Sequence, residues 1–259
     1  MRTEVRVLLL LTCCAIGLAS AAQTPSQVPG PKTAERAGEV VLVAGASGQT
    51  GREIVRQLRD QGYTVRAMAR SAQRLADLGP GVQPVVGDVT DPPSLVRALS
   101  QVNVVISAIG GRWPIGENGF EAVDYRGNQA LIDAAKRARV RRFMLVSAGS
   151  AGRKGFLYEL PIAPYPWKAR AEDYLRASGL DYSIVAAGGL EDGPVGLSGI
   201  RVARRPDYVV GPINRADVAR VIVACMTDQS CSRKTITAIN DPARPPDAWR
   251  AQLAALPRD

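Results

Sequence analysis

The chain of 259 residues contains no histidine. A Ser-His-Asp triad, a Cys-His pair and every metal site that needs histidine are therefore excluded, and we expect no metal. Cysteine is scarce too, with four residues, which is too few for a disulfide-rich scaffold. Aromatic residues make up only 5% of the chain. Because nucleic-acid surfaces place aromatic side chains among basic ones, we expect a small-molecule substrate and no nucleic acid.

Apolar runs long enough to cross a membrane are also missing. Residues 7–19 are almost wholly apolar, but a comfortable span needs about 20 residues. This run follows Arg2 and Arg6 and precedes Ala19-Ser20-Ala21, so residues 1–21 are predicted to be a cleaved secretory signal peptide. Export to the periplasm is then expected. The alternatives are a membrane anchor, if the signal stays uncleaved, and a cytoplasmic protein, if translation starts downstream.

The remaining composition is that of a globular protein. Apolar residues amount to 46% and charged residues to 22%, and the excess of Lys and Arg gives a net charge of +9. That excess favours anionic ligands. Residues 22–38 hold three prolines and no aromatic residue, which predicts a disordered linker. Residues 39–259 are predicted to form a single domain.

Short apolar runs typical of buried strands alternate with helical patterns from residue 39 onward. Strands are expected at 40–44, 63–69, 82–86, 102–108, 142–147, 181–186 and 234–239. Helices are expected before Gly62 and at 92–99, 125–139, 168–177, 215–226 and 246–256. This alternation predicts an α/β fold with a doubly wound, mostly parallel sheet of the Rossmann type. Ligands of such sheets bind at the carboxyl ends of the strands.

A glycine-rich segment, GASGQTG at 45–51, lies between the first strand and the first helix. Glycines there allow a tight turn, and the helix N-terminus presents N–H groups and partial positive charge to a diphosphate. The spacing is G-x-x-G-x-x-G, which differs from the G-x-G-x-x-G fingerprint of dehydrogenases. The alternative is a tight turn that binds nothing. The residues predicted to bind the phosphates are Gly45, Ser47, Gly48, Gln49, Thr50 and Gly51.

Arg70 follows the second predicted strand. An NAD-binding enzyme places an acidic residue near this position to bind the ribose 2′-hydroxyl. A guanidinium suits a 2′-phosphate instead, because its charge and its fork of donors match that group. The sequence therefore favours NADP as the cofactor over NAD. The alternative is an arginine that is merely solvated at a strand end.

Several motifs together resemble a known family. They are GASGQTG, VVGDVTDP, RRFMLVSAGSAG, RAEDYLRASGLDYSIV and NRADVA. They resemble the atypical short-chain dehydrogenase/reductase superfamily, and within it the NAD(P)H-binding, NmrA-like group, which includes flavin, biliverdin and quinone reductases and redox-sensing proteins. The resemblance implies that Asp88 and Val89 hold the adenine and that residues 108–110 (Ala108, Ile109, Gly110) pass beneath the nicotinamide ribose. It further implies that Ser147 faces the nicotinamide and that Lys168 binds the ribose hydroxyls.

The sequence also departs from this family. Catalytic members place a tyrosine four residues before the lysine, where this chain has Pro164. Tyr165 stands three residues before Lys168, and a cation beside a phenol would make it a general acid. The alternative is a tyrosine packed among prolines. Many relatives have Arg-Pro where this chain has Ala186-Ala187.

Other charged residues are predicted to have structural roles. Glu172 and Asp173 are expected on a solvated helix face, and Asp217 is expected to cap its helix or to pair locally with Arg215. Two arginine groups are expected to form a solvated rim: Arg137, Arg139, Arg141 and Arg142, and Arg201, Arg204 and Arg205. Cys225 and Cys231, six residues apart, favour a short-loop disulfide in an exported protein, and two separate thiols are the alternative.

These observations lead to two functional hypotheses. The first is an NADP(H)-dependent reductase of a small carbonyl, quinone or flavin-like acceptor, in which Lys168 fixes the ribose and Ser147 or Tyr165 supplies the proton. The second is a nicotinamide-binding sensor or scaffold without turnover. The missing tyrosine at position 164 and the Ala186-Ala187 pair favour the second hypothesis.

Overall fold

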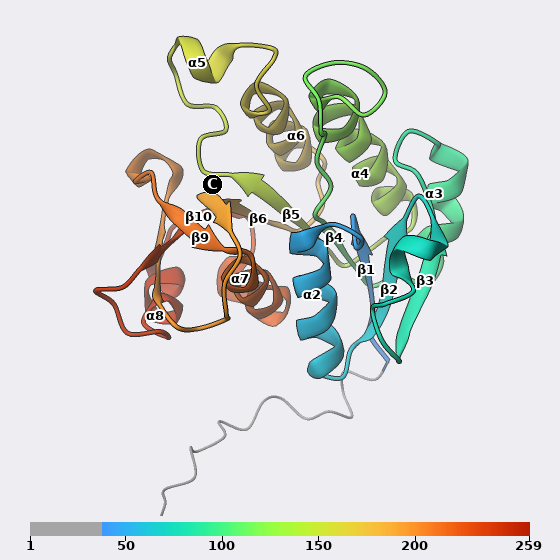
Figure 1. The fold of residues 1–259 in the computed structure, drawn as a ribbon, viewed down its shortest axis with the longest axis horizontal. Coiled ribbons are helices and arrows are strands. Elements are labelled where there is room, and N and C mark those ends of the chain that lie inside the picture. Colours follow the sequence, from blue (N-terminus) through green and yellow to red (C-terminus); the bar gives the residue numbers. More distant parts are fainter. Residues whose placement is uncertain (1–37) are drawn as a thin grey trace, which may run out of the picture. The chain divides into compact units, whose positions relative to one another are not determined.

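The computed structural model describes residues 38–259. The predicted signal peptide and all but the last residue of the predicted linker lie outside the described residues. An eight-stranded sheet runs through the described part, in the order β3-β2-β1-β4-β5-β6-β10-β8 (Figure 1). Its strands are parallel except β8, which pairs antiparallel with β10. Their bounds are β1 Val40–Ala44, β2 Thr64–Ala69, β3 Val82–Val86, β4 Val104–Ser107, β5 Arg142–Ala148, β6 Tyr182–Ala187, β8 Gly199–Ala203 and β10 Lys234–Asp241.

Helices cover both faces of this sheet, as Figure 1 shows. Successive residues of a strand point to opposite faces, so Val41 and Val43 join one core while Leu42 and Ala44 join the other. The first core is closed by α2 (Gln49–Asp60), α7 (Arg215–Thr227) and α8 (Trp249–Ala255). The second is closed by α3 (Pro92–Ala98), α4 (Asn128–Arg137) and α6 (Tyr165–Ala177). The predicted doubly wound, mostly parallel fold is therefore confirmed.

The structure differs from the predicted elements in three places. The first part of the helix expected at 125–139 is a wider π-helical segment, η2 (Glu121–Gly127), which continues into α4. Helix α6 begins at Tyr165, three residues earlier than expected, because Pro166 fits the first turn, where no N–H is needed. The third difference is a set of short elements that the sequence analysis missed: α5 (Phe156–Glu159), β7 (Gly189–Glu191), β8, β9 (Pro212–Asn214), and the 3₁₀ segments η1 (Ala72–Leu75), η3 (Arg205–Asp207) and η4 (Gln229–Cys231).

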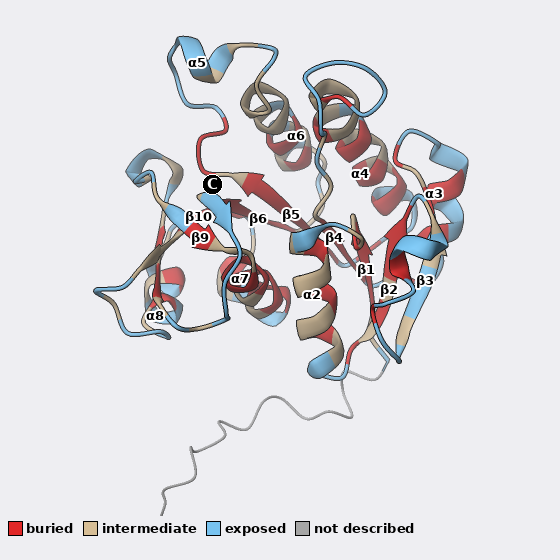
Figure 2. Ribbon diagram, viewed as in Figure 1, coloured by how far each residue is buried: buried red, intermediate tan, exposed pale blue. Residues whose placement is uncertain are grey.

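Burial is concentrated in the strands and in the helix faces that touch them (Figure 2). Cys225 at the end of α7 and Cys231 in η4 are both buried and form a disulfide, as predicted. Arg142 corrects the expectation of a solvated arginine rim: its side chain is fully buried and bonds to Asp181 at 2.7 Å. It also donates to the Cys225 carbonyl, so it caps the carboxyl end of α7.

Within residues 38–259, no helix combines the length and the apolar character that crossing a membrane requires. The same part of the chain contains no cluster of cysteine and carboxylate side chains that could bind a metal ion.

Candidate functional site

The turn between β1 and α2 requires glycine at two of its three glycine positions. Gly45 has a φ of +82°, and a Cβ atom there would lie 2.6 Å from the carbonyl oxygen of Ala108. A Cβ atom on Gly51 would lie 2.2 Å from the carbonyl oxygen of Gly45, so the glycine lets the helix start directly against the turn. Gly48 precedes the first residue of α2. The first-turn amides of α2 have no partner inside the helix and are available to an anion.

A pocket of about 220 Å³ opens beside this turn, at the carboxyl ends of β1, β2, β3 and β4. This is the point at which the strand order reverses, where doubly wound folds bind dinucleotides. The pocket brings together most of the residues predicted to bind the cofactor: Gly45, Ser47, Gly48, Arg70, Asp88, Val89, Ala108, Ile109 and Gly110. A pocket at this switch point with four glycines in its wall, Gly45, Gly48, Gly87 and Gly110, suits a dinucleotide.

Three predicted cofactor residues do not line this pocket, namely Gln49, Thr50 and Gly51. Gln49 instead bonds through its side-chain amide to Asp192, at 3.3 Å. Thr50 and Gly51 lie in the first turn of α2.

The pocket wall is rich in arginine. Arg70 lies at the exit of β2 and donates to the side-chain oxygen of Asn118, which belongs to the loop after β4. Arg74 in η1 and Arg112 after β4 also line the pocket, together with the acidic Asp88 and Glu117. The sequence analysis missed Arg74 and Arg112. The spacing of Arg74, four residues beyond Arg70 in the same loop, was a signal that could have found it.

Lys168 is held by a carboxylate that the sequence analysis did not single out. The Nζ atom of Lys168 lies 2.6 Å from Oδ1 of Asp124, whose side chain is only 1% exposed. The other oxygen of Asp124 accepts a hydrogen bond from the Gly111 amide at 2.8 Å. Asp124 therefore links α6 to the loop after β4, next to the position predicted for the nicotinamide ribose.

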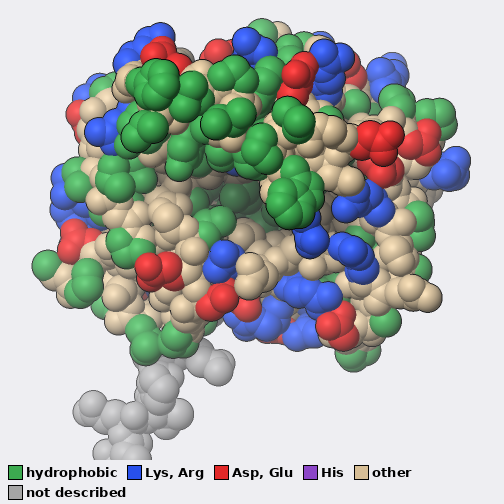
Figure 3. Space-filling view, turned by 45° about the horizontal axis from the view of Figure 1, so that its top comes forward, with side chains coloured by type: hydrophobic (Ala, Val, Ile, Leu, Met, Phe, Trp, Pro, Cys, Tyr) green, Lys and Arg blue, Asp and Glu red, His purple; other side chains and the backbone are tan. Residues whose placement is uncertain are grey.

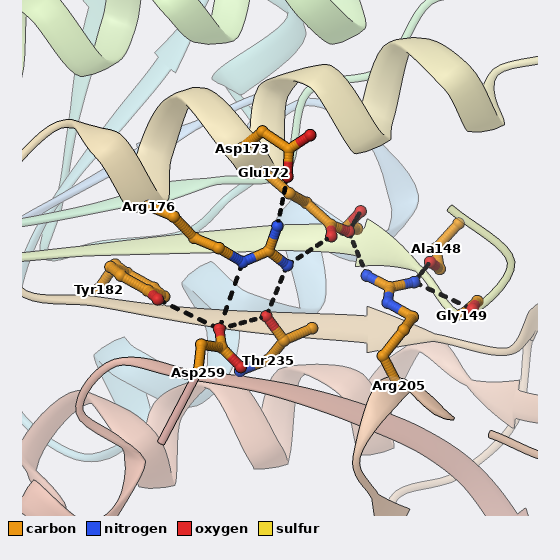
Figure 4. A network of polar contacts seen from close by, with 10 residues as sticks. Ala148, Gly149, Glu172, Asp173, Arg176, Tyr182, Arg205, Thr235 and Asp259 are labelled. Atoms are coloured by element: carbon orange, nitrogen blue, oxygen red, sulfur yellow. Dashed lines mark hydrogen bonds and ion pairs between the residues drawn. The ribbon is translucent and has the colours of Figure 1, made fainter. Parts of the chain in front are cut away.

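Ser147 and Glu172 form the second polar contact of α6. Ser147, at the end of β5, donates to Oε1 of Glu172 at 2.5 Å. Glu172 is 2% exposed, so the predicted solvated face is wrong for this residue. Arg205 from η3 bonds to the same carboxylate oxygen, and Arg176 bonds to Oε2 at 3.0 Å (Figure 4). Asp173 is exposed, as predicted, and pairs with Arg176.

Tyr165 lies in the first turn of α6, three residues before Lys168. Its ring packs against that of Tyr158, with 5.6 Å between the ring centroids. No hydrogen bond joins Tyr165 to Lys168 in the described structure. A further phenol, missed from the sequence, lies nearby: burial raises the pKa of Tyr208, and its ring covers Gly149, whose Cβ atom would lie 2.2 Å from the ring.

Asp217 does not pair with Arg215, which corrects the sequence analysis. It is fully buried and accepts hydrogen bonds from the Gly196 amide at 2.9 Å and from the Asn240 side chain at 2.8 Å. Arg215 pairs with Asp192 at 2.8 Å. Asp217 thus joins the start of α7 to β10, which is a structural role.

Comparison with known proteins agrees with this geometry. A family profile described as NAD(P)H-binding matches residues 45–229. Sanguinarine reductase of Eschscholzia californica is 31% identical over 237 residues, which cover 75% of this chain and 86% of that protein. Photosystem II assembly factor Ycf39 of Cyanophora paradoxa is 35% identical over 157 residues, covering 60% of this chain and 47% of the relative.

A solved structure is also similar. The crystal structure of the oxidoreductase ylbE from Lactococcus lactis has a TM-score of 0.72 and 25% identity, and the match covers 84% of this chain and 96% of that chain. The present chain spans about half the length of several curated relatives that it matches. The profile, the relative and the solved structure agree, so the chain belongs to the NAD(P)H-binding family, in its atypical short-chain dehydrogenase/reductase, NmrA-like group.

Proposed function

We propose that the protein is an NADP(H)-dependent reductase of a small carbonyl, quinone or flavin-like acceptor. The observation that carries this proposal is the pocket at the β1–β4 switch point, with Arg70, Arg74 and Arg112 on its wall. Three guanidinium groups on the wall of this pocket favour a cofactor with an additional phosphate on its adenosine ribose.

Different residues along the carboxyl edge of the sheet then bind different parts of the cofactor. The turn before α2 binds the diphosphate, and Lys168, fixed by Asp124, binds the ribose hydroxyls at the nicotinamide end. When bound, the reduced nicotinamide supplies a hydride, and one proton completes the reduction of the acceptor. Tyr165, in the first turn of α6, is the side chain best placed to donate that proton, because Lys168 is on the same helix three residues away.

Apolar side chains around the site favour a flat, largely apolar acceptor. The loop after β4 exposes Trp113 and Ile115, and the α5 segment exposes Phe156 and Leu157, each at least 65% exposed. Figure 3 shows apolar side chains gathered around a hollow on this face of the molecule. The relative named sanguinarine reductase supports the reductase assignment.

A purified sample tests the proposal directly. We expect NADPH to raise the melting temperature more than NADH does, and NADPH absorbance to fall when a quinone, flavin or aldehyde acceptor is added. Lys168→Met serves as the comparison variant, because it lacks the cation that is proposed to bind the ribose. Stabilisation by neither dinucleotide would contradict the proposal.

A second candidate function is an NAD(P)H-binding sensor or scaffold without turnover. The ring of Tyr165 packs on Tyr158, and no hydrogen bond connects it to Lys168 among residues 38–259. The relative named as a photosystem II assembly factor supports this candidate. Tight NADPH binding with no acceptor reduced across the panel would favour it over the reductase.

We also propose that the protein is exported. The buried Cys225–Cys231 disulfide supports an oxidising compartment, and it stands beside the predicted signal at residues 1–21. Cell fractionation with N-terminal sequencing of the purified protein tests this. Recovery of the intact chain in the cytoplasm with four reactive thiols, those of Cys13, Cys14, Cys225 and Cys231, would contradict it.

A further inference from the structure

The hydroxyl of Ser147 points in a fixed direction, because it bonds to the Glu172 carboxylate and two arginines hold that carboxylate in place. Both oxygens of the Glu172 carboxylate face donors that cannot accept a proton: Arg205 at Oε1 and Arg176 at Oε2. A guanidinium carries N–H donors and no acceptor, so the Glu172 carboxylate is the acceptor in both contacts. Two cations lie beside this carboxylate, and it accepts from Ser147 as well.

The hydrogen bond between Ser147 and Glu172 must then use the serine's proton. Their oxygens are 2.5 Å apart, which is the distance expected for an O–H donor and a charged acceptor. Once that proton is committed to Glu172, the Ser147 oxygen has only lone pairs left. Within the described residues, no protein group donates a hydrogen bond to it. Any ligand group that meets Ser147 must therefore be a donor.

Four further hydrogen bonds keep this arrangement in place. Arg205 also donates to the carbonyl oxygens of Ala148 and Gly149, at 2.6 and 2.9 Å, so it ties η3 to the residues directly after Ser147 (Figure 4). On the other side, Arg176 is held by Asp259 and Thr235. The guanidinium groups are anchored to separate elements, and the carboxylate between them cannot turn away from Ser147.

From this geometry we infer that Glu172 is a positioning residue that makes Ser147 a hydrogen-bond acceptor for the carboxamide N–H of the bound nicotinamide. The inference rests on the proposed function, in which Lys168 binds the ribose at the nicotinamide end: Glu172 lies one helical turn after Lys168 on α6, so its partner Ser147 lies beside that end of the site. The reacting oxygen of a carbonyl or quinone, like the reacting ring nitrogen of a flavin, is itself a hydrogen-bond acceptor and cannot pair with Ser147. The carboxamide nitrogen is a donor that every nicotinamide cofactor carries. It follows that Ser147 does not supply the proton of reduction, which leaves that role to Tyr165.

A cofactor analogue isolates this contact. In the 3-acetylpyridine analogue of NADP⁺, a methyl group replaces the carboxamide nitrogen, so the donor is lost while the shape is nearly kept. We would measure the dissociation constants of NADP⁺ and of this analogue by calorimetry, with no acceptor present. We expect the unmodified protein to prefer NADP⁺ by roughly three- to tenfold, the range for one neutral hydrogen bond.

Two variants then test whether Ser147 and Glu172 cause the preference for NADP⁺. Ser147→Ala should weaken NADP⁺ binding and leave the analogue unchanged, so that the preference disappears. Glu172→Gln should reduce or reverse it, because the glutamine amide can donate to Ser147 and release the serine proton toward the ligand. Because Ser147→Ala removes a single oxygen atom, it carries the test even where Glu172→Gln reduces folding.

Matched controls come from neighbouring residues. Ser107→Ala removes another buried serine hydroxyl at a strand end, one that bonds to Asn128 at 2.6 Å. Asp173→Asn neutralises the exposed carboxylate next to Glu172, which shares Arg176. Both variants should keep the preference for NADP⁺.

Two results would overturn the inference. One is equal binding of NADP⁺ and the analogue by the unmodified protein, and the other is a preference that Ser147→Ala leaves intact. Either result leaves the proposed reductase standing, because both ligands still bind. Failure of the unmodified protein to bind either ligand would overturn the proposed function and this inference together.

Discussion

Replacing Arg70 with alanine should change cofactor selectivity more than it changes cofactor binding in general. The Arg70 side chain is exposed at the rim of the dinucleotide pocket, where the 2′-phosphate of NADPH would lie. A hydrogen bond to a charged group contributes about 1.5–3 kcal/mol, and solvent exposure places this contact near the lower end. A loss of about 1.5–2 kcal/mol corresponds to a ten- to thirtyfold weaker NADPH complex. NADH has no such phosphate, so its affinity should change less than about threefold.

Titration of protein fluorescence with NADPH and NADH measures both affinities, and repeating it in added salt sharpens the result. The phosphate contact should weaken as salt rises, because exposed charges are screened. In the unliganded protein Arg70 donates to Asn118, so the NADPH affinity of Asn118→Ala shows how much this competing contact weakens cofactor binding. Arg97→Ala is the control, an exposed arginine on α3 that does not line the pocket. Equal losses for the two cofactors on Arg70→Ala would refute the assignment.

Three further predictions concern the scaffold of the site. Gly51→Ala should abolish dinucleotide binding and lower the melting temperature, because its Cβ atom would meet the Gly45 carbonyl oxygen at 2.2 Å; unchanged NADPH affinity would contradict this. Arg142→Met should cost about 2–4 kcal/mol in urea unfolding, since it takes a buried donor from half-buried Asp181 and from the carbonyl at the end of α7, whereas the exposed Arg141→Met should cost under about 1 kcal/mol; equal costs would contradict the argument. Burial and the Asp259 carboxylate raise the pKa of Tyr182 to about 12, above its ordinary value of 10, so its contribution to stability is present below pH 10 and lost between pH 10 and 12. The unfolding free energy should therefore decrease less between pH 9 and pH 11 in Tyr182→Phe than in the unmodified protein.

The sequence predicts the glycine turn and the strand ends that line the pocket well, because the signals for these features are local. The turn at 45–51 joins a buried strand to an amphipathic helix, and Gly45 and Gly51 are required by backbone atoms within a few residues or at the end of one neighbouring strand. The apolar runs fix the central strands to within one or two residues for the same reason. Short elements with little apolar content, such as β7 and β9, carry no comparable signal and were missed.

The charged residues were predicted less well, because their burial depends on partners far away in the chain. Buried Glu172 bonds to Arg205, and buried Arg142 bonds to the end of α7. In both contacts the two partners are dozens of residues apart in the sequence. A partial signal was nevertheless present. Lys168, Glu172 and Arg176 are spaced four apart and share one face of α6, and buried Leu175 lies beside that face. A charged row flanked by apolar residues indicates an interior network more readily than a solvated face.

The ion pair between Lys168 and Asp124 does not by itself decide between a reductase and a binding protein. The ammonium group of Lys168 has three N–H donors, and Asp124 takes one of them at 2.6 Å. Two donors remain for the two hydroxyls of a nicotinamide ribose, and the lysine side chain is still 20% exposed. Asp124 therefore orients Lys168 and leaves N–H donors available, so the cofactor can bind without breaking the Lys168–Asp124 ion pair. What separates the two functions is the proton donor: Tyr165→Phe should abolish acceptor reduction and leave NADPH affinity unchanged if the protein is a reductase, whereas a binding protein shows no turnover in either form.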